Sequence, residues 1–216
     1  DTPVSQLTFS TNSNNEIVIT GFASGISLTE INIPSTINTL PVTTIGNFAF
    51  NGSSITNATL PASLTTIELY AFGSSDIQTI EMPGVKTIEE AAFENCQSLT
   101  AVTLPVSLQT IGSTSFGYCG SLATLTVDPN NLNYKSINNV LFNKSGTELI
   151  LYSIGQNATS YTVPSDVQTI GEGAFAGSSL VSITLPNSIQ TIDSYSFMDC
   201  NDLESIILPN SIQTIG

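Results

Sequence analysis

The chain of 216 residues has no histidine, arginine or tryptophan, and only three lysines against 17 acidic residues. Its net charge of −14 argues against nucleic acids and anionic membranes as partners, because both attract basic surfaces. Without histidine, neither a Ser-His-Asp relay nor imidazole ligation of a metal is available. No apolar run approaches membrane-spanning length, so no membrane insertion is expected within this sequence.

Charged residues are also scarce, at 9% of the chain. The surface must therefore consist mainly of Ser, Thr and Asn, which is common in secreted proteins and unusual in cytosolic ones. This composition favours an extracellular or cell-surface location.

What the sequence does contain is a repeated phrase, apolar-x-x-apolar-x-apolar-Pro, as in Leu99–Pro105. A fixed period in the twenties predicts a solenoid, in which each coil stacks only on its neighbours. The alternation before the proline predicts a short strand, and these strands form what we call the first sheet. The prolines of the phrase recur at intervals of about 22 to 27 residues, with one interval of about 35: Pro34, Pro61, Pro83, Pro105, Pro129, Pro164, Pro186 and Pro209.

In six copies a second phrase follows, about ten residues after the first phrase begins, and it reads Thr-Ile, three variable residues, then Ala or Ser before Phe, as in Thr66–Phe72. It predicts a second short strand in each coil, and these strands form what we call the second sheet. The aliphatic side chains of both phrases should meet inside the coil. The phenylalanines of the second phrase are then expected in one buried file: Phe50, Phe72, Phe93, Phe116, Phe175 and Phe197.

Two regions depart from the period. Residues 1–27 predict an N-terminal β-hairpin cap, and residues 28–216 predict the solenoid of about eight repeats. The interval between Phe116 and Phe175 is about thirteen residues longer than two coils need. The extra length predicts an inserted β-hairpin around residues 130–157 that stands on the rod. The sequence stops halfway through a repeat, so we expect further repeats beyond it or a last coil covered by another subunit.

The three cysteines each lie three residues after a repeat phenylalanine: Cys96, Cys119 and Cys200. Equivalent positions of neighbouring coils stack, so Cys96 and Cys119 should be close. Two interpretations are open, a disulfide between these two residues or small buried thiols that fill a fixed slot.

Together, Leu99–Pro105, Leu108–Gly112 and Ser115–Cys119 resemble the BspA-like leucine-rich repeats of bacteria and protists. The resemblance covers about residues 5–216 and includes the opening segment Ile33–Gly46. With the hairpins above, it implies a mainly β, right-handed leucine-rich-repeat solenoid of stacked short parallel strands. It also implies a secreted or surface-exposed protein of a host-associated microbe that adheres to host matrix proteins or to other cells.

Two groups of residues form the candidate contact surface. The inserted hairpin combines two of the three lysines with aromatic residues: Tyr134, Lys135, Phe142, Lys144 and Tyr152. The position before each Ala/Ser-Phe pair should leave three aromatics partly outside: Phe48, Tyr70 and Tyr195. In the alternative interpretation, Phe142 belongs to a small core of the hairpin itself, and the exposed aromatics only cover the neighbouring coil.

We identify no catalytic, metal-binding or cofactor-binding residues. A carbohydrate-active solenoid needs paired carboxylates, whereas Glu30 and Glu81 on the first sheet are two coils apart, roughly 10 Å. The prediction is a non-catalytic, adhesin-like module that binds host matrix or cell-surface proteins through the repeat array. A purely structural spacer of a longer surface protein is the first alternative, and a glycan-binding solenoid is the second.

Overall fold

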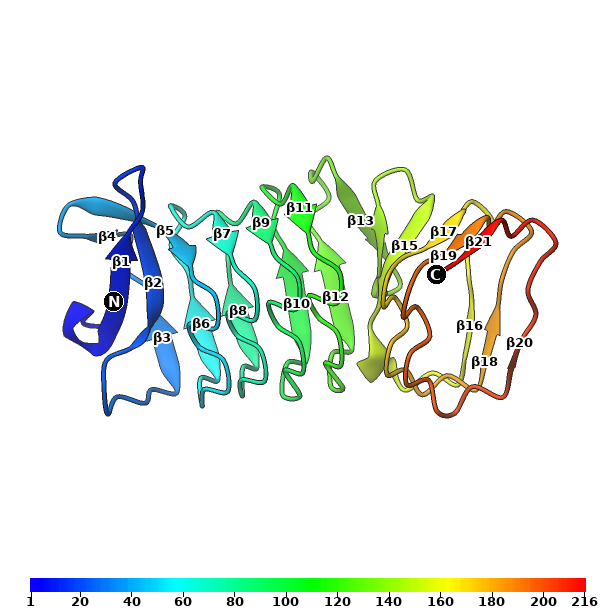
Figure 1. The fold of residues 1–216 in the computed structure, drawn as a ribbon, viewed down its shortest axis with the longest axis horizontal. Helices are drawn as coiled ribbons and strands as arrows, with labels where there is room; N and C mark the ends of the chain where they lie inside the picture. The colour runs from blue at the N-terminus through cyan, green and yellow to red at the C-terminus, as the bar shows by residue number, and fades with distance from the viewer.

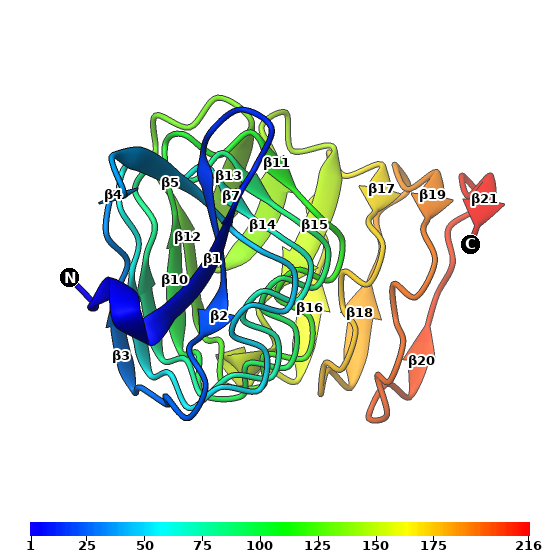
Figure 2. The same cartoon turned by 60° about the vertical axis from the view of Figure 1, so that its left-hand side comes forward.

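The computed structural model describes all 216 residues as an elongated stack of coils (Figure 1). There is no α-helix, and two 3-10 turns, η1 (Val4–Gln6) and η2 (Ile154–Gln156), are the only helical segments. The mainly β solenoid predicted from the period is confirmed. The N-terminal hairpin lies at one end of the stack, and the last strands lie at the other (Figures 1 and 2).

The first sheet consists of parallel strands of two to four residues, one per coil, that precede the repeat's proline. Their side chains stack in register, so that Ile31 pairs with Ala58 and Ala58 with Ile80. The residues pointing outward form columns of small polar side chains, and the Thr103 and Thr126 hydroxyls are 3.0 Å apart. The strands are β3 (Glu30–Asn32), β6 (Asn57–Thr59), β8 (Thr79–Glu81), β10 (Ala101–Leu104), β12 (Thr124–Val127), β16 (Ser160–Thr162), β18 (Ser182–Thr184) and β20 (Ser205–Ile206).

The second sheet is built by the Thr-Ile phrase, and Thr stacks on Thr and Ile on Ile from coil to coil. At its N-terminal end β1 and β2 form an antiparallel hairpin, and β2 also pairs in parallel with β5. The strands of this half are β1 (Leu7–Thr11), β2 (Ile17–Phe22), β4 (Thr36–Ile37), β5 (Leu40–Ile45), β7 (Thr66–Ile67), β9 (Thr87–Ile88) and β11 (Thr110–Ile111).

A second block of this sheet begins after residue 133. An antiparallel meander of three strands leads into it, and the third strand, β15, pairs in parallel with β17. The strands are β13 (Tyr134–Ile137), β14 (Val140–Asn143), β15 (Glu148–Tyr152), β17 (Thr169–Ile170), β19 (Thr191–Ile192) and β21 (Thr214–Ile215).

The interior contains the predicted file of phenylalanines. Phe72 stacks on Phe93 with ring centroids 5.3 Å apart, and Phe93 stacks on Phe116 at 4.9 Å. These rings are buried together with the aliphatic residues of both sheets. Stacking of identical side chains at the coil spacing explains why the phrases repeat so strictly, because each ring contacts the equivalent ring above and below.

The cysteines fill a fixed slot behind this file. All three are free, and Cys96 and Cys119 are buried. The Cys96 thiol donates a hydrogen bond to the Phe72 carbonyl at 3.1 Å, and the Cys119 thiol donates to the Phe93 carbonyl at 3.2 Å. The structure therefore has the thiol arrangement and not the disulfide.

Neither sheet runs unbroken along the rod. The first sheet is interrupted between β8 and β10 and again between β12 and β16, and the second sheet is interrupted between β11 and β13. The interior divides into a core of 33 buried residues and a core of 14. We call the boundary where both sheets stop, after β11 and β12, the seam.

Candidate functional site

The inserted segment does not project from the rod as expected. Phe142 is 1% exposed and Tyr152 is 3% exposed, and both belong to the smaller core of the solenoid. Strands β14 and β15 supply side chains to both cores, so the segment is an internal part of the stack. The prediction that Phe142 and Tyr152 are exposed contact residues is therefore wrong, because these side chains are needed inside the rod.

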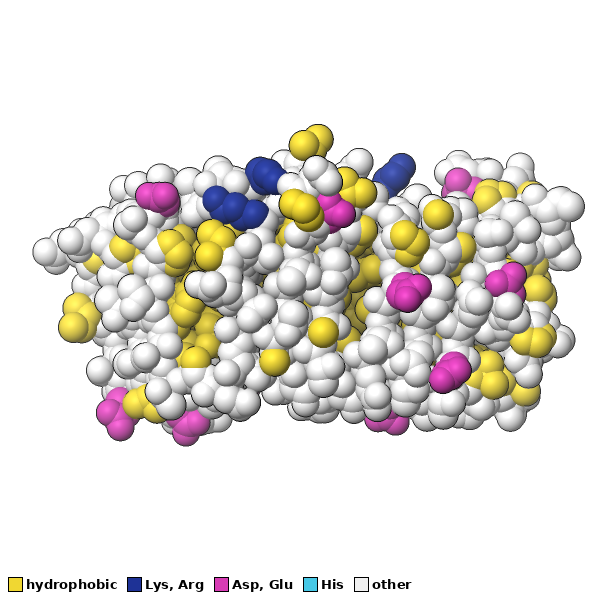
Figure 3. Space-filling model, turned by 180° about the vertical axis from the view of Figure 1, so that it is seen from behind, with side chains coloured by type: hydrophobic (Ala, Val, Ile, Leu, Met, Phe, Trp, Pro, Cys, Tyr) yellow, Lys and Arg dark blue, Asp and Glu magenta, His cyan; other side chains and the backbone are white.

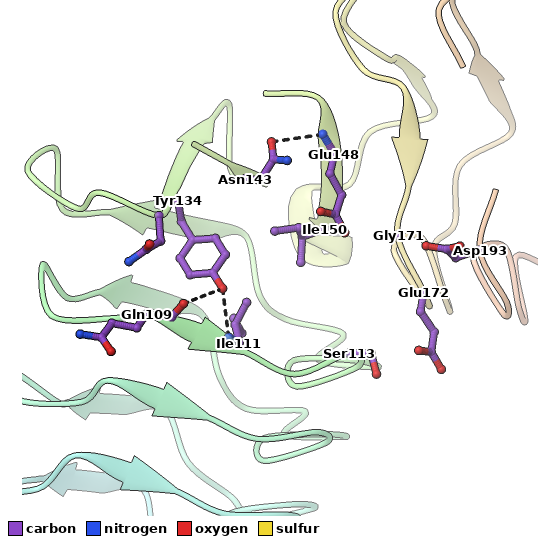
Figure 4. Close-up of a pocket in the computed structure, with 11 residues that line it drawn as sticks. Gln109, Ile111, Ser113, Tyr134, Asn143, Glu148, Ile150, Gly171, Glu172 and Asp193 are labelled. Carbon is purple, nitrogen blue, oxygen red and sulfur yellow. Dashed lines mark hydrogen bonds between the residues drawn. The ribbon is translucent and has the colours of Figure 1, made fainter. Parts of the chain in front are cut away.

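Tyr134 is half-buried and closes the free edge of β11. Its hydroxyl accepts a hydrogen bond from the Ile111 amide at 3.2 Å and donates to the Gln109 carbonyl at 3.3 Å (Figure 4). The side chain thus replaces a neighbouring strand that is missing at the seam. Burial raises the pKa of Tyr134. A phenol hydroxyl can donate one hydrogen bond and accept another, as this one does.

The two lysines of the segment are engaged with their own loops. The Lys135 ammonium donates to the Ser145 carbonyl at 3.2 Å, and the Lys144 ammonium donates to the Asn131 carbonyl. Lys135 is half-buried and Lys144 is exposed. The Lys135 bond fixes the loop between β14 and β15, and the Lys144 bond fixes the turn that precedes β13.

Asn131 organises the start of the segment from a fully buried position. Its amide nitrogen donates to the carbonyls of Pro105 at 2.8 Å and Leu108 at 3.0 Å. Its amide oxygen accepts hydrogen bonds from the Asn133 and Tyr134 backbone, both at 2.8 Å. One side chain therefore connects the preceding coil to the strand that carries Tyr134.

The other three candidate residues lie on the corner that precedes each buried phenylalanine, and we call this row of corners the turn ridge. The backbone there is left-handed, with φ of 56° at Phe48, 51° at Tyr70 and 59° at Tyr195. Other coils place Ala91, Thr114 and Gly173 at the same corner. At this corner the rings of Phe48 and Tyr195 are mostly exposed, whereas the small side chain of Ala91 is buried.

Phe48 and Tyr70 form an aromatic pair near the N-terminal end of the ridge. Their rings are stacked, with centroids 5.2 Å apart and an interplanar angle of 11°. Phe48 remains 54% exposed, and Tyr195, at the far end of the ridge, is 64% exposed. The ridge therefore presents large aromatic surfaces to solvent, as predicted from the sequence position.

A cavity of about 340 Å³ lies where the ridge crosses the seam, and Tyr195 is one of the residues that line it. Tyr118 lies on one side, and its hydroxyl donates to a carboxylate oxygen of Asp199 at 2.9 Å. Burial, followed by this hydrogen bond, raises the pKa of Tyr118 to about 12. Tyr118, Met198 and Glu172 line the cavity and were not singled out from the sequence. Aligning the coils would have marked Tyr118, because it occupies the corner position of Ser74 and Asn95.

A second cavity of about 520 Å³ lies at the seam beside the second sheet, next to Tyr134 (Figure 4). Glu148, Glu172 and Asp193 lie across this opening from Tyr134. Burial, and then repulsion by Asp193, raises the pKa of Glu148. The lining is polar, and Glu172 also lines the cavity on the ridge, so the two hollows adjoin.

Elsewhere the surface is chemically plain. Figure 3 shows acidic side chains set apart on a face of mostly uncharged atoms. No group of three or more His, Cys, Asp or Glu residues is placed to hold a metal ion. None of the helical segments has the length and apolar character needed to cross a membrane.

Comparison with known proteins agrees with this architecture. The model of the BspA type leucine-rich repeat region matches residues 15–148 and 150–216, in six copies. No curated protein matches the chain. Among solved structures, the chain is similar to the pneumococcal vaccine antigen PcpA, with 24% identity and a TM-score of 0.67 over 96% of this chain and 69% of that one.

Two further structures share the fold. A leucine-rich repeat protein from Eubacterium ventriosum is 22% identical with a TM-score of 0.75, over 98% of this chain and 66% of that one. A leucine rich cell surface protein from Faecalibacterium prausnitzii is 21% identical with a TM-score of 0.51, over 98% and 78%. The chain thus spans about two thirds of the length of the first two relatives. Since the family model covers most of its residues, the chain belongs to the BspA-type leucine-rich-repeat family.

Proposed function

We propose that the chain is a non-catalytic interaction module of a secreted or cell-surface protein. It acts like an adhesin and binds host matrix or cell-surface proteins through the turn ridge. The observation that carries this proposal is the exposure of Phe48 and Tyr195 on left-handed corners, with Tyr70 stacked on Phe48. Two further observations support it: the chain belongs to a leucine-rich-repeat family, and one protein of similar structure is described as a cell surface protein.

The physical argument concerns where binding energy can come from. Aromatic side chains dominate the hot spots of protein interfaces, whereas small hydroxyl side chains contribute little. The first sheet offers outward columns of small polar residues, such as Thr59, Thr103 and Thr184. On the ridge, the neighbouring coils of Phe48 and Tyr70 carry a stacked pair of rings, and Tyr195 carries a third ring beyond the seam. Repetition of such weak sites along a rod adds affinity by multivalency.

A binding experiment tests the proposal. The chain is measured by biolayer interferometry against an array of extracellular matrix and cell-surface proteins. For any protein that it binds, the triple variant Phe48→Ala, Tyr70→Ala, Tyr195→Ala should bind at least about tenfold more weakly. The matched control is Thr59→Ala, Thr103→Ala, Thr184→Ala, which truncates three exposed residues of the first sheet and should leave binding unchanged.

A structural spacer is the second candidate, and the plain columns of the first sheet favour it. A spacer predicts no binding to any protein on the array. If the control variant loses as much affinity as the ridge variant, the first sheet carries the contact and the ridge does not. Binding to a glycan array without binding to the protein array would support the glycan-binding alternative instead.

A further inference from the structure

The cavity on the turn ridge exists because two distant coils face each other across the seam. The turn that contains Thr114 and Tyr118 lies against the turn of Gly173 and Gly177. A Cβ atom on Gly173 would lie 2.8 Å from Thr114 Cγ2, and one on Gly177 would lie 2.9 Å from the Tyr118 ring. Glycine at these two positions therefore allows the close approach. We call the resulting hollow the seam groove.

One part of the seam groove is aromatic and apolar. Tyr118, Tyr195, Met198 and the buried Ala176 line it. Tyr195 is 64% exposed and Met198 is 47% exposed, so both offer contact area that the protein itself does not use. The hydrogen bond from Tyr118 to Asp199 holds the Tyr118 ring in place beside them.

The other part of the seam groove is acidic. Glu90, Glu94 and Glu172 line it, and Glu172 leads into the second cavity with Glu148 and Asp193. No lysine lines either cavity. Two of the three lysines donate to backbone carbonyls within the inserted segment. The carboxylates that line the groove therefore have no lysine among the other lining residues.

This combination restricts the chemistry of a ligand. Ionised carboxylates only accept hydrogen bonds, so the ligand must be rich in donors. The faces of tyrosine rings attract cations. Lys and Arg side chains carry donors without acceptors, and Arg in addition stacks on aromatic rings. We propose that the seam groove binds a basic segment of a protein partner, with a Lys or Arg side chain placed between Tyr195 and the acidic residues.

This inference rests on the proposed function, because it names the chemistry of the partner at one part of the same ridge. The charge of the whole chain works in its favour. At −14, the chain attracts basic segments over a distance, and the groove provides the place where such a segment is desolvated and held. Specificity then comes from the groove, while the association rate comes from the net charge.

The test uses fluorescein-labelled oligoarginine and oligolysine peptides as probes and fluorescence anisotropy as the measurement. The unmodified chain should bind both peptides, and binding should weaken strongly as salt is raised. Tyr195→Ala should weaken binding about three- to fivefold. Ile207→Ala, which removes an exposed large side chain that does not line the groove, should leave binding unchanged. Glu172→Gln should also weaken binding, whereas Glu30→Gln removes the same charge from the exposed first sheet and should have little effect.

Two outcomes would overturn the inference. If Glu172→Gln and Glu30→Gln lose the same peptide affinity, the peptides are attracted by the net charge of the chain and not by a site. If the peptides do not bind even at low salt, the groove does not bind cationic side chains. The protein array distinguishes this inference from the proposed function. If ridge variants weaken binding to an array protein and the groove variants do not, the proposed function is supported and the assignment of the groove is wrong. If the peptides bind in the groove and no array protein does, the proposed function falls.

Discussion

Tyr152 stacks on Phe175 in the position where other coils have a phenylalanine. Their ring centroids are 5.4 Å apart. The Tyr152 amide donates to the Ala174 carbonyl at 2.8 Å, just as the Phe72 amide donates to the Ala92 carbonyl at 2.8 Å. The inserted segment therefore continues the aromatic file on the far side of the seam with a tyrosine.

This relationship predicts different results for two substitutions. Tyr152→Ala leaves a cavity beside Phe175 and should lower the free energy of unfolding by about 3–5 kcal/mol. Tyr152→Phe keeps the ring and should change it by less than about 1 kcal/mol. Urea unfolding followed by circular dichroism measures both. A large loss for Tyr152→Phe would mean that the hydroxyl, and not the ring, holds this position.

Asn131 should be one of the most sensitive polar residues. Asn131→Ala removes the donors to the Pro105 and Leu108 carbonyls and the acceptor for two backbone amides, in a site that is buried or part-buried. Unsatisfied buried groups cost about 1–3 kcal/mol each, so we expect a loss of at least about 3 kcal/mol in the free energy of unfolding. Asn130→Ala, at the exposed neighbouring position, is the matched control and should be nearly neutral. Similar losses for both variants would contradict this role of Asn131.

The free, hydrogen-bonded cysteines lead to one chemical prediction and one mutational prediction. Alkylation of the unfolded chain without reductant, followed by mass spectrometry, should find all three thiols free. Cys96→Ser should cost no more than about 1 kcal/mol, because Ser75 and Ser178 occupy the same position in other coils. Only one alkylated cysteine, with a mass deficit of two hydrogens, would indicate a disulfide between Cys96 and Cys119.

The raised pKa of Glu148 should make the stability of the chain depend on pH. Its pKa in the folded chain is raised, mainly by burial, above the unfolded value of about 4.3. The folded state therefore binds the proton more tightly, and this contribution to stability is lost as pH rises through the folded pKa. Glu148→Gln should raise the melting temperature at pH 7 by about 1–2 °C, and the difference should shrink below pH 4. Glu30→Gln serves as the control for loss of one charge, and an equal rise with it would contradict the local explanation.

The periodic part of the fold could be predicted from sequence because each position of the phrase has one structural role. A residue such as Phe93 lies between equivalent residues in the next coils, so spacing alone places it. The corner residues Phe48 and Tyr195 could also be placed, since they directly precede the Ala/Ser-Phe pair.

The inserted segment could not be placed in the same way. The alternation in Glu148–Tyr152 fits a projecting hairpin as well as a rung of the second sheet, and only the pairing of β15 with β17 decides between them. Sequence likewise gave no sign that Tyr118 meets Asp199, 81 residues later. That contact depends on how two blocks of coils meet at the seam, a geometry that no local pattern describes.

The left-handed corners have a consequence for how such a rod can change. Phe48, Tyr70, Ala91, Thr114, Gly173 and Tyr195 share one backbone shape while differing widely in size and polarity. At the seam Gly173 has no space for a side chain beside Thr114, but elsewhere the same corner holds the large ring of Phe48 as well as the small side chain of Ala91 on one scaffold. Recognition could therefore be rewritten along the ridge, one corner at a time, on an unaltered scaffold.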